Sequence, residues 1–256
     1  MSGIREHKGN LLLKGRSPRD GYSKLVGCGE MGLKHLEFGL LRLPSGARSG
    51  KTGKCEQALD TLSGVVEIEA GGRPLGRLGG RKDIFSGAPS LIYLPPKTPY
   101  RIAVVEGPVE IAVFSASAPD FEGEPADAGP AIGEEFPAAK LLVGEASILP
   151  GRWSDFPPRK HDAFAPPNEV PLEEVLYFRV KPMRGFGIVR VYTHRNDPGP
   201  MDEVHVIEDG DTVVIARGYH TIAAAPGCAL AYTWAMAGEI RRLCPGSPDP
   251  RYSLPG

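Results

Sequence analysis

The sequence lacks the features that identify several large classes of protein. Its 256 residues contain no uninterrupted apolar run of about 18 residues, which excludes a membrane-spanning helix. No apolar segment lies near the N-terminus, so we expect no signal peptide. The formal net charge is −1 and no block of like charge is present. We therefore expect neither nucleic acid nor a membrane as a partner.

Cysteine is also scarce. The sequence has four cysteines, and no two of them form a Cys-x-x-Cys pair. This number and spacing exclude a dense disulfide framework and give no sign of a paired-cysteine metal or redox site. We therefore expect reduced thiols in a cytoplasmic protein. The four residues are Cys28, Cys55, Cys228 and Cys244.

The first half of the chain has no long stretch with helical periodicity, whereas glycine (33 residues) and proline (26 residues) are abundant. These residues separate segments of about 4–8 residues that are rich in Val, Ile, Leu and aromatics, which is typical of short strands joined by turns. The pattern predicts an all-β sandwich or barrel. Examples are residues 36–43, 64–70 and 109–115 in the first half, and 173–180, 187–193 and 230–236 in the second.

The strand rhythm of the first half is repeated after a stretch of different composition. This stretch begins at Pro119, is acidic and rich in Ala, Gly and Pro, and has few large apolar residues. We therefore expect two all-β units, at residues 21–118 and 141–256, joined by a linker at 119–140. The polar and basic residues 1–20 are expected to form a flexible arm.

Two histidines and a glutamate in the second half are candidates for metal ligands. His161, His220 and the pair Glu173-Glu174 lie at the ends of strand-like segments that a β-barrel brings together. Two imidazoles and a carboxylate suit a divalent metal that keeps positions open for a substrate. Adjacent strand residues point to opposite faces, so periodicity leaves open which glutamate faces the histidines. The alternative is that both glutamates lie exposed on an edge strand.

Other polar residues of the second half have two interpretations each. Glu203 and His205 are two residues apart and therefore share a face, either as a catalytic base with its neighbour or as part of a polar outer surface. Arg179, Arg184 and Arg190 lie in the same region. A guanidinium suits a carboxylate substrate, and the alternative is ordinary surface charge.

Several short motifs in this order resemble the 5-deoxy-glucuronate isomerases of inositol breakdown, and the resemblance covers roughly residues 35–250. Relatives of that family are the uronate ketol-isomerases of pectin breakdown. The motifs include Lys160-His161-Asp162, Leu172-Glu-Glu-Val175, Gly185-Phe-Gly187, Gly218-Tyr-His220 and, in the first half, Tyr93-Leu-Pro-Pro96. The resemblance implies a bicupin, with two double-stranded β-helix (jelly-roll) barrels and a metal in the C-terminal one.

The ligand motif of this family is His-x-His, then Glu, then a distant His. Carried over residue by residue, it matches His161, Glu174 and His220, which settles the choice that periodicity leaves open. The first His of the pair is Arg159 here, and arginine cannot ligate a cation. The family's pattern is therefore kept at three of its four ligand positions, and His205 is a conceivable replacement nitrogen.

The resemblance implies an intramolecular oxidoreductase, an aldose–ketose isomerase that converts 5-deoxy-glucuronate to 5-dehydro-2-deoxy-gluconate. We expect a divalent metal, zinc among the candidates, as cofactor, a small sugar acid as substrate and a homo-oligomer as assembly. Arg159, Arg179 and Arg190 are expected to bind the substrate carboxylate, and Glu203 to move the proton. Two alternatives stay open: a metal-poor bicupin that binds a sugar acid without turnover, favoured by Arg159, and a metal-cupin oxygenase.

Overall fold

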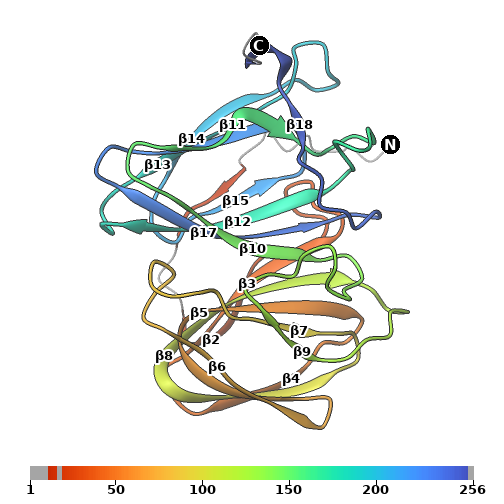
Figure 1. Cartoon of the computed structure of the whole chain (residues 1–256), viewed down its shortest axis with the longest axis vertical. Coiled ribbons are helices and arrows are strands. Elements are labelled where there is room, and N and C mark those ends of the chain that lie inside the picture. Colours follow the sequence, from red (N-terminus) through yellow and green to blue (C-terminus); the bar gives the residue numbers. More distant parts are fainter. Residues whose placement is uncertain (1–10, 16–18, 253–256) are drawn as a thin grey trace, which may run out of the picture.

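The computed structural model describes residues 11–15 and 19–252, and this part of the chain is almost entirely β-strand. Within the described ranges the only helix is η1 (Pro250–Tyr252), a single 3-10 turn. No helix there is long and apolar enough to cross a membrane. The all-β class expected from the sequence is confirmed, and Figure 1 shows two barrels stacked along the long axis of the molecule.

The N-terminal barrel is built from one sheet that wraps round on itself. Its strand order is β2-β3-β8-β5-β7-β9, and β4 and β6 pair with β8 and β5 respectively. The strands are β2 (Gly21–Val26), β3 (Leu36–Leu43), β4 (Ala47–Lys51), β5 (Cys55–Ala70), β6 (Arg73–Arg81), β7 (Leu91–Leu94), β8 (Pro99–Ser117) and β9 (Ala126–Gly129). Because β5 and β8 are long, each crosses from one side of the barrel to the other.

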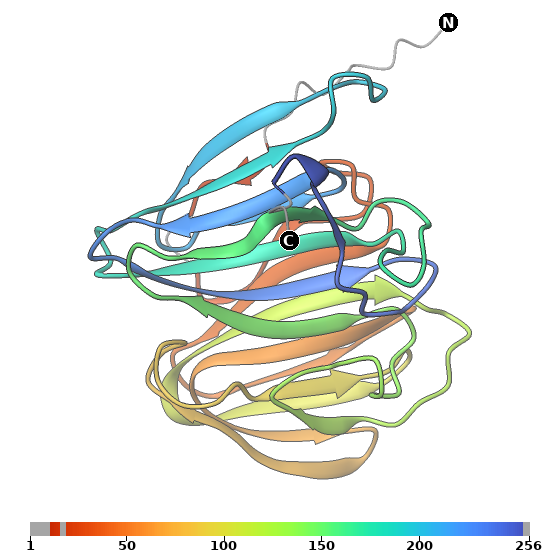
Figure 2. The ribbon, with the colours of Figure 1, turned by 45° about the horizontal axis from the view of Figure 1, so that its top comes forward.

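The C-terminal barrel consists of two five-stranded sheets, with orders β1-β15-β12-β17-β10 and β14-β13-β16-β11-β18. In Figure 2, β13 and β14 are the cyan and light-blue strands farthest from the N-terminal barrel. The strands are β1 (Leu12–Leu13), β10 (Leu142–Ile148), β11 (Trp153–Lys160), β12 (Glu173–Lys181), β13 (Gly187–Tyr192), β14 (Asp202–Ile207), β15 (Thr212–Ile215), β16 (Tyr219–Ala224), β17 (Ala229–Ala237) and β18 (Ser247–Pro248).

The two barrels differ at the bends of their strands. In β5 the residue at the bend is Gly64, whose φ of 82° lets the strand shift register and turn without ending. β8 likewise continues through its bend at Gly107 and Pro108. In the C-terminal barrel β12 ends before Pro182 and β16 ends before Ala225, so two separate sheets result.

Three large hydrophobic cores and one small cluster hold the molecule together. One fills each barrel, and the third and largest lies between the barrels, where Phe38 and Phe114 stack with ring centroids 4.9 Å apart. Successive residues of β12 serve two of these cores: Tyr177 packs between the barrels, whereas Leu176 and Phe178 pack inside the C-terminal one. Burial of one such side chain stabilises the fold by roughly 1.5–3 kcal/mol. The strand is therefore apolar on both faces.

Two glutamates join the barrels in the same way. Glu173, at the start of β12, accepts hydrogen bonds from the backbone N–H groups of residues 34–36, at 2.7 Å from Lys34 and 2.6 Å from His35, just before β3. Glu56, near the start of β5, accepts from the N–H groups of residues 139–141 at 2.7–2.8 Å, just before β10. We call these two contacts the Glu56 and Glu173 clasps. Each clasp ties one barrel to the strand that begins the other.

The expected arm and linker take part in the fold where they are described. Residues 1–10 and 16–18 of the expected arm lie outside the described residues. Leu12–Leu13 form β1, which pairs with β15 of the C-terminal barrel, so this part is a strand and not an arm. Within the expected linker, β9 pairs with β7, and Ile132 forms a bridge with Val143. The connection between the barrels is thus packed against both of them.

Candidate functional site

The three residues matched to metal ligands meet inside the C-terminal barrel. His161 follows directly after β11, Glu174 is the second residue of β12, and His220 is the second residue of β16. The alternation of the strands turns them inward, since Leu176 on β12 and Ile222 on β16, each two residues further on, belong to the interior core. Three strands from two sheets therefore deliver one imidazole or carboxylate each to one end of the barrel.

The potential ligand atoms of these residues all lie within 4.8 Å of one another. Oε2 of Glu174 is 3.3 Å from Nε2 of His161 and 3.5 Å from Nε2 of His220. Metal–ligand bonds of about 2.0–2.2 Å place tetrahedral ligand atoms roughly 3.4 Å apart, so the spacing suits a cation of this size. The side chains are buried, with relative exposures of 8% for His161, 4% for Glu174 and 5% for His220.

Hydrogen bonds on the far side of each ring orient both histidines. Nδ1 of His161 lies 2.8 Å from the carbonyl oxygen of Leu172, and Nδ1 of His220 lies 3.2 Å from that of Gly218. A carbonyl oxygen can only accept, so both rings carry a proton on Nδ1. In the neutral rings Nε2 then presents a lone pair toward the carboxylate of Glu174. Three electron-pair donors that face one point fit a divalent cation, and the two carbonyl oxygens fix the rings as in known metal sites.

The pKa values of the three side chains are shifted as expected for groups that share a buried site. Burial disfavours a protonated His161, but the hydrogen bond and charge of Glu174 outweigh burial and raise its pKa. Burial lowers the pKa of His220. Burial also opposes ionisation of Glu174, yet, when the rings carry a second proton, the hydrogen bond from Nε2 of His161 and both imidazolium charges lower the pKa of Glu174. The carboxylate is thus ionised and suited to hold a positive charge.

Arg159 occupies the position where the family pattern has a fourth ligand. It lies directly opposite His220 in the pairing of β11 with β16. Its Nη1 donates a hydrogen bond to the carbonyl oxygen of Pro245, at 3.2 Å, on the segment that leads to β18. One N–H group of the guanidinium is thus hydrogen-bonded to the C-terminal segment. Arg159 remains the one predicted arginine that lies beside the cluster.

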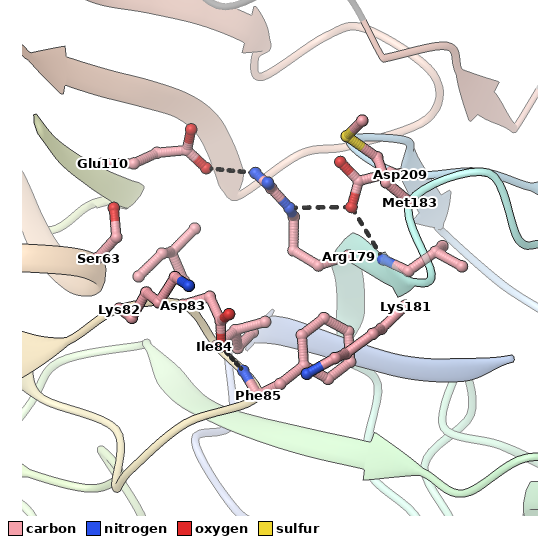
Figure 3. A pocket seen from close by; sticks show the side chains of 12 residues that line it. Ser63, Lys82, Asp83, Ile84, Phe85, Glu110, Arg179, Lys181, Met183 and Asp209 are labelled. Atoms are coloured by element: carbon pink, nitrogen blue, oxygen red, sulfur yellow. Dashed lines mark hydrogen bonds and ion pairs between the residues drawn. The ribbon is translucent and has the colours of Figure 1, made fainter.

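Arg179, a predicted substrate ligand, faces away from the cluster. It lies five residues after Glu174 on β12, and an odd separation places two strand residues on opposite faces. Figure 3 shows its guanidinium between Glu110 and Asp209, with Nη1 2.8 Å from Glu110 and Nε 3.1 Å from Asp209. These partners line a separate cleft of about 270 Å³ between the barrels. The structure thus places Arg179 apart from the cluster, and a role for it in substrate binding stays a prediction.

Arg190 also lies outside the barrel interior. Its neighbours on β13, Val189 and Val191, belong to the interior core, so Arg190 points to the outer face of the sheet. There it forms two hydrogen bonds to Asp202, at 2.8 and 2.7 Å, and stacks over the ring of Tyr192. Arg190 is thus also placed apart from the cluster, and its binding of the substrate carboxylate stays a prediction.

Glu203 and His205 share the inner face of β14, and Nε2 of His205 lies 2.9 Å from Oε2 of Glu203. Val191 pairs with Glu203 on one side and with His220 on the other, so strand β13 separates the two residues. With strands about 4.8 Å apart, Glu203 lies roughly 10 Å from His220 across the sheet. Neither Glu203 nor His205 belongs to the ligand group. Their pairing is with each other.

Three polar residues near the cluster have no counterpart among the sequence candidates. Oγ of Ser154 lies 3.0 Å from Oδ2 of Asp155 and 3.1 Å from the hydroxyl of Tyr232. Tyr232 is 4% exposed and packs in the interior core. The charge of Asp155 acts on both Tyr232 and His220. The Pro-Pro pair after Phe156 is the only local sign of an irregular strand, and it does not say which side chain turns inward.

Comparisons with known proteins match both halves of the chain. The model of the KduI/IolB family matches residues 13–128 and again residues 129–251. A curated protein of Geobacillus kaustophilus (strain HTA426), named 5-deoxy-glucuronate isomerase, is 31% identical over 252 residues, which cover 90% of each chain. A second relative with this name, from Shouchella clausii (strain KSM-K16), is 30% identical and covers 82% of this chain and 83% of its own.

Solved structures share the fold. The crystal structure of an IolB-like protein from Salmonella typhimurium LT2 superposes with a TM-score of 0.86 at 25% identity and covers 96% of this chain and 98% of its own. Oxalate decarboxylase of Lactobacillus farciminis matches with a TM-score of 0.64 at 14% identity, over 91% of this chain and 88% of its own. The expected bicupin architecture is therefore confirmed.

Proposed function

Because the chain belongs to the KduI/IolB family, we propose that it is an aldose–ketose isomerase of 5-deoxy-glucuronate. The observation that carries this proposal is the buried cluster of His161, Glu174 and His220, whose electron pairs face one point inside the C-terminal barrel. The product is 5-dehydro-2-deoxy-gluconate, as in inositol breakdown. A reducing cytoplasm is part of the proposal and is consistent with four free thiols.

The reaction moves hydrogen within one molecule. With the carbons numbered as in the substrate, the substrate has an aldehyde at C1 and a hydroxyl at C2. The product has a hydroxyl at C1 and a ketone at C2. The C2–H bond breaks, a C1–H bond forms, and a proton passes from the oxygen on C2 to the oxygen on C1. The site therefore has to polarise a carbonyl, carry a proton between neighbouring carbons and hold the carboxylate at the other end of the sugar acid.

His161, Glu174 and His220 would hold a divalent cation, and zinc, manganese, iron and nickel all accept two imidazoles and a carboxylate. A bound cation supplies Lewis-acid polarisation of the carbonyl. The chain's own groups keep this set in place. The carbonyl oxygens of Leu172 and Gly218 fix the rings, and the apolar interior of the barrel excludes water from the carboxylate.

Arg159 is proposed to bind the carboxylate of the substrate. It lies opposite His220 and is partly buried, and Pro245 is the acceptor of its hydrogen bond. A guanidinium has five N–H donors, so it can accept a carboxylate while it keeps that bond. In this arrangement the residue that replaces the fourth ligand of the family binds the charged end of the sugar acid.

The proposal is tested by assaying the purified protein with 5-deoxy-glucuronate while its metal content is measured. We expect conversion to the ketose, loss of turnover after dialysis against a chelator, and recovery when zinc or manganese is added back. Full turnover by metal-free protein would show that the cluster acts without a cation. Binding of the sugar acid without turnover would favour the metal-poor alternative, and uptake of oxygen would favour an oxygenase.

A further inference from the structure

Strand β11 is irregular beside the cluster. Its pairing with β16 is regular at Trp153 and Ser154, then shifts register before Arg159. Within this bulge Asp155 has a φ of 56°, the left-handed region that residues with a Cβ rarely adopt. Strain of this kind in a residue other than glycine is concentrated at functional sites, because the surrounding structure has to enforce it. A bulge also redirects a side chain that regular alternation would send elsewhere.

The bulge brings the Asp155 carboxylate to the inner side of the sheet. Ser154 pairs with Ile222, an interior residue, so regular alternation would send the next residue outward. The hydrogen bonds show the opposite: Oγ of Ser154 lies 3.0 Å from Oδ2 of Asp155 and 3.1 Å from the buried hydroxyl of Tyr232. Carboxylate, serine hydroxyl and phenol thus form a chain that begins at the bulge and ends in the barrel interior.

This chain lies next to the strand that carries His220. β11 and β16 are neighbours, and Ser154 is held to β16 by its carbonyl oxygen, which accepts a 3.0 Å hydrogen bond from Oγ1 of Thr221. Glu203, by contrast, is separated from β16 by the whole of β13. Asp155 is therefore the better placed of the two carboxylates for chemistry at the cluster.

We propose that Asp155 is a catalytic residue that carries the proton between the two carbons of the substrate. Its carboxylate takes the proton when the C2–H bond breaks, and the electron pair of that bond forms the enediol. The same carboxyl group then returns the proton to C1, and the carboxylate is regenerated. Ser154 holds the carboxylate in position through its hydrogen bond to Asp155, and its Oγ in turn contacts the hydroxyl of Tyr232. This proposal rests on the isomerase function proposed above.

The test compares Asp155→Asn with the wild type in the isomerase assay, with exposed Asp120→Asn as the matched control. Loss of a general base lowers kcat by about 10²–10⁴-fold. We expect a fall in kcat of this size, with metal content and thermal midpoint close to those of the wild type. In deuterated water, incorporation of deuterium at the hydroxymethyl carbon of the product, which was C1 of the substrate, falls in parallel. The Asp120→Asn protein should keep its full turnover.

Two further variants make the outcome decisive. Asp155→Glu keeps a carboxyl group and should recover part of the turnover that Asp155→Asn loses. Ser154→Ala removes only the positioning hydrogen bond and should lower kcat about tenfold, with KM nearly unchanged. If Asp155→Asn does not fold, Ser154→Ala still decides the matter, because an unchanged kcat there overturns the proposal.

Failure of the proposal differs from failure of the proposed function. A wild-type protein that does not convert the sugar acid contradicts both. A wild type that isomerises while Asp155→Asn retains kcat within about threefold contradicts only the role of Asp155, since a lost base costs at least 10²-fold. The role passes to Glu203 if Glu203→Gln instead shows the large loss of turnover and of deuterium incorporation.

Discussion

The two barrels share a frame but differ at the positions that face the end of each interior. Glu174 on β12 pairs with the last residue of β15 and with β17, and Gln57 on β5 pairs in the same way with the last residue of β7 and with β8. The residues before them, Glu173 and Glu56, form the two clasps. An amide therefore stands in the N-terminal barrel where the C-terminal barrel has its carboxylate.

The histidine of β16 also has a different counterpart. His220 lies two residues before Ile222, an interior residue of the C-terminal barrel, and Tyr100 on β8 lies two residues before Ile102, an interior residue of the N-terminal barrel. Each follows the turn after a short strand, β15 or β7. Tyr100 thus occupies the place of His220, and a phenol stands there instead of an imidazole.

The third ligand position follows from backbone hydrogen bonds. The carbonyl oxygen of His161 accepts from the N–H of Leu172, directly before Glu173, and that of Thr52 accepts from the N–H of Cys55, directly before Glu56. Thr52 therefore corresponds to His161. Arg159, opposite His220, corresponds in the same way to Gly50, opposite Tyr100. The N-terminal barrel thus has none of the three ligands.

The residues that stabilise the two barrels are different from the residues at the ligand positions. Each barrel is held by its own apolar core, by the core shared between the barrels and by one clasp, and none of these involves a ligand position. In the N-terminal barrel, Oε1 of Gln57 is buried without a hydrogen-bond partner among the described residues. Three side chains can thus remove a metal site from a barrel without altering its strands.

The largest expected effect comes from giving the C-terminal barrel the residue of the N-terminal one. In Glu174→Gln the charged oxygen is lost, so we expect the protein to be purified without stoichiometric metal. Turnover should fall by about 10³-fold, since Lewis-acid stabilisation is worth several kcal/mol. The reverse change, Gln57→Glu, should leave turnover and metal content as in the wild type. Metal retained by Glu174→Gln would show that the cluster is not the metal site.

The clasps predict an effect on stability that is the same in both barrels. Glu173→Ala and Glu56→Ala each leave three backbone N–H groups without their acceptor, which should cost about 2–4 kcal/mol of unfolding free energy. The thermal midpoint should fall by roughly 5–15 °C for a chain of this size. Exposed Glu122→Ala is the control and should unfold like the wild type. A large effect at one clasp only would mean that the barrels do not depend on each other equally.

The C-terminal barrel alone carries residues 247–252 across its outer sheet, and Asp249 anchors this segment. Burial raises the pKa of Asp249, but hydrogen bonds from Arg251 and Tyr192 lower it to about 2. The folded pKa is thus below the unfolded value of about 3.9. Its contribution, roughly 1–2 kcal/mol, is present above pH 4 and is lost as the pH falls toward 2.

Unfolding in denaturant between pH 5 and about 2 measures this contribution. Asp249→Asn should lower stability at pH 5 and flatten its dependence on pH below 4. An equal dependence on pH in the variant and the wild type would assign the acid sensitivity to other carboxylates.

The smallest effect is expected on the outer face of the sheet that carries His220. Arg190→Ala removes an exposed ion pair with Asp202, which is worth at most about 1 kcal/mol. Because Arg190 points away from the interior, KM for the sugar acid should stay within about twofold of the wild type, whereas loss of a charge-assisted bond would raise it about tenfold or more. A tenfold rise would return Arg190 to the substrate site.

Much of the site was predictable from residue types and their order. Two histidines and a glutamate at the ends of strand-like segments identify the cluster, and the family motif selects Glu174 over Glu173. The choice of Glu174 as the inward residue also decides on which face of the strand Arg179 lies. Five residues separate it from Glu174, so alternation alone places it on the other face. Arg190 was harder to place, because its inward neighbours, Val189 and Val191, become informative only when the sheet they face is known.

What the sequence by itself determined is the class of fold, the duplication and the set of possible ligands, because strand periodicity and residue chemistry are local properties. Only the tertiary structure decided which side chains meet. The bulge that turns Asp155 inward breaks the very alternation that sequence reasoning relies on. The separation of Glu203 from His220 depends on β13 lying between their strands. Strand order and register are set by contacts between distant segments, so they become visible only when the chain is folded.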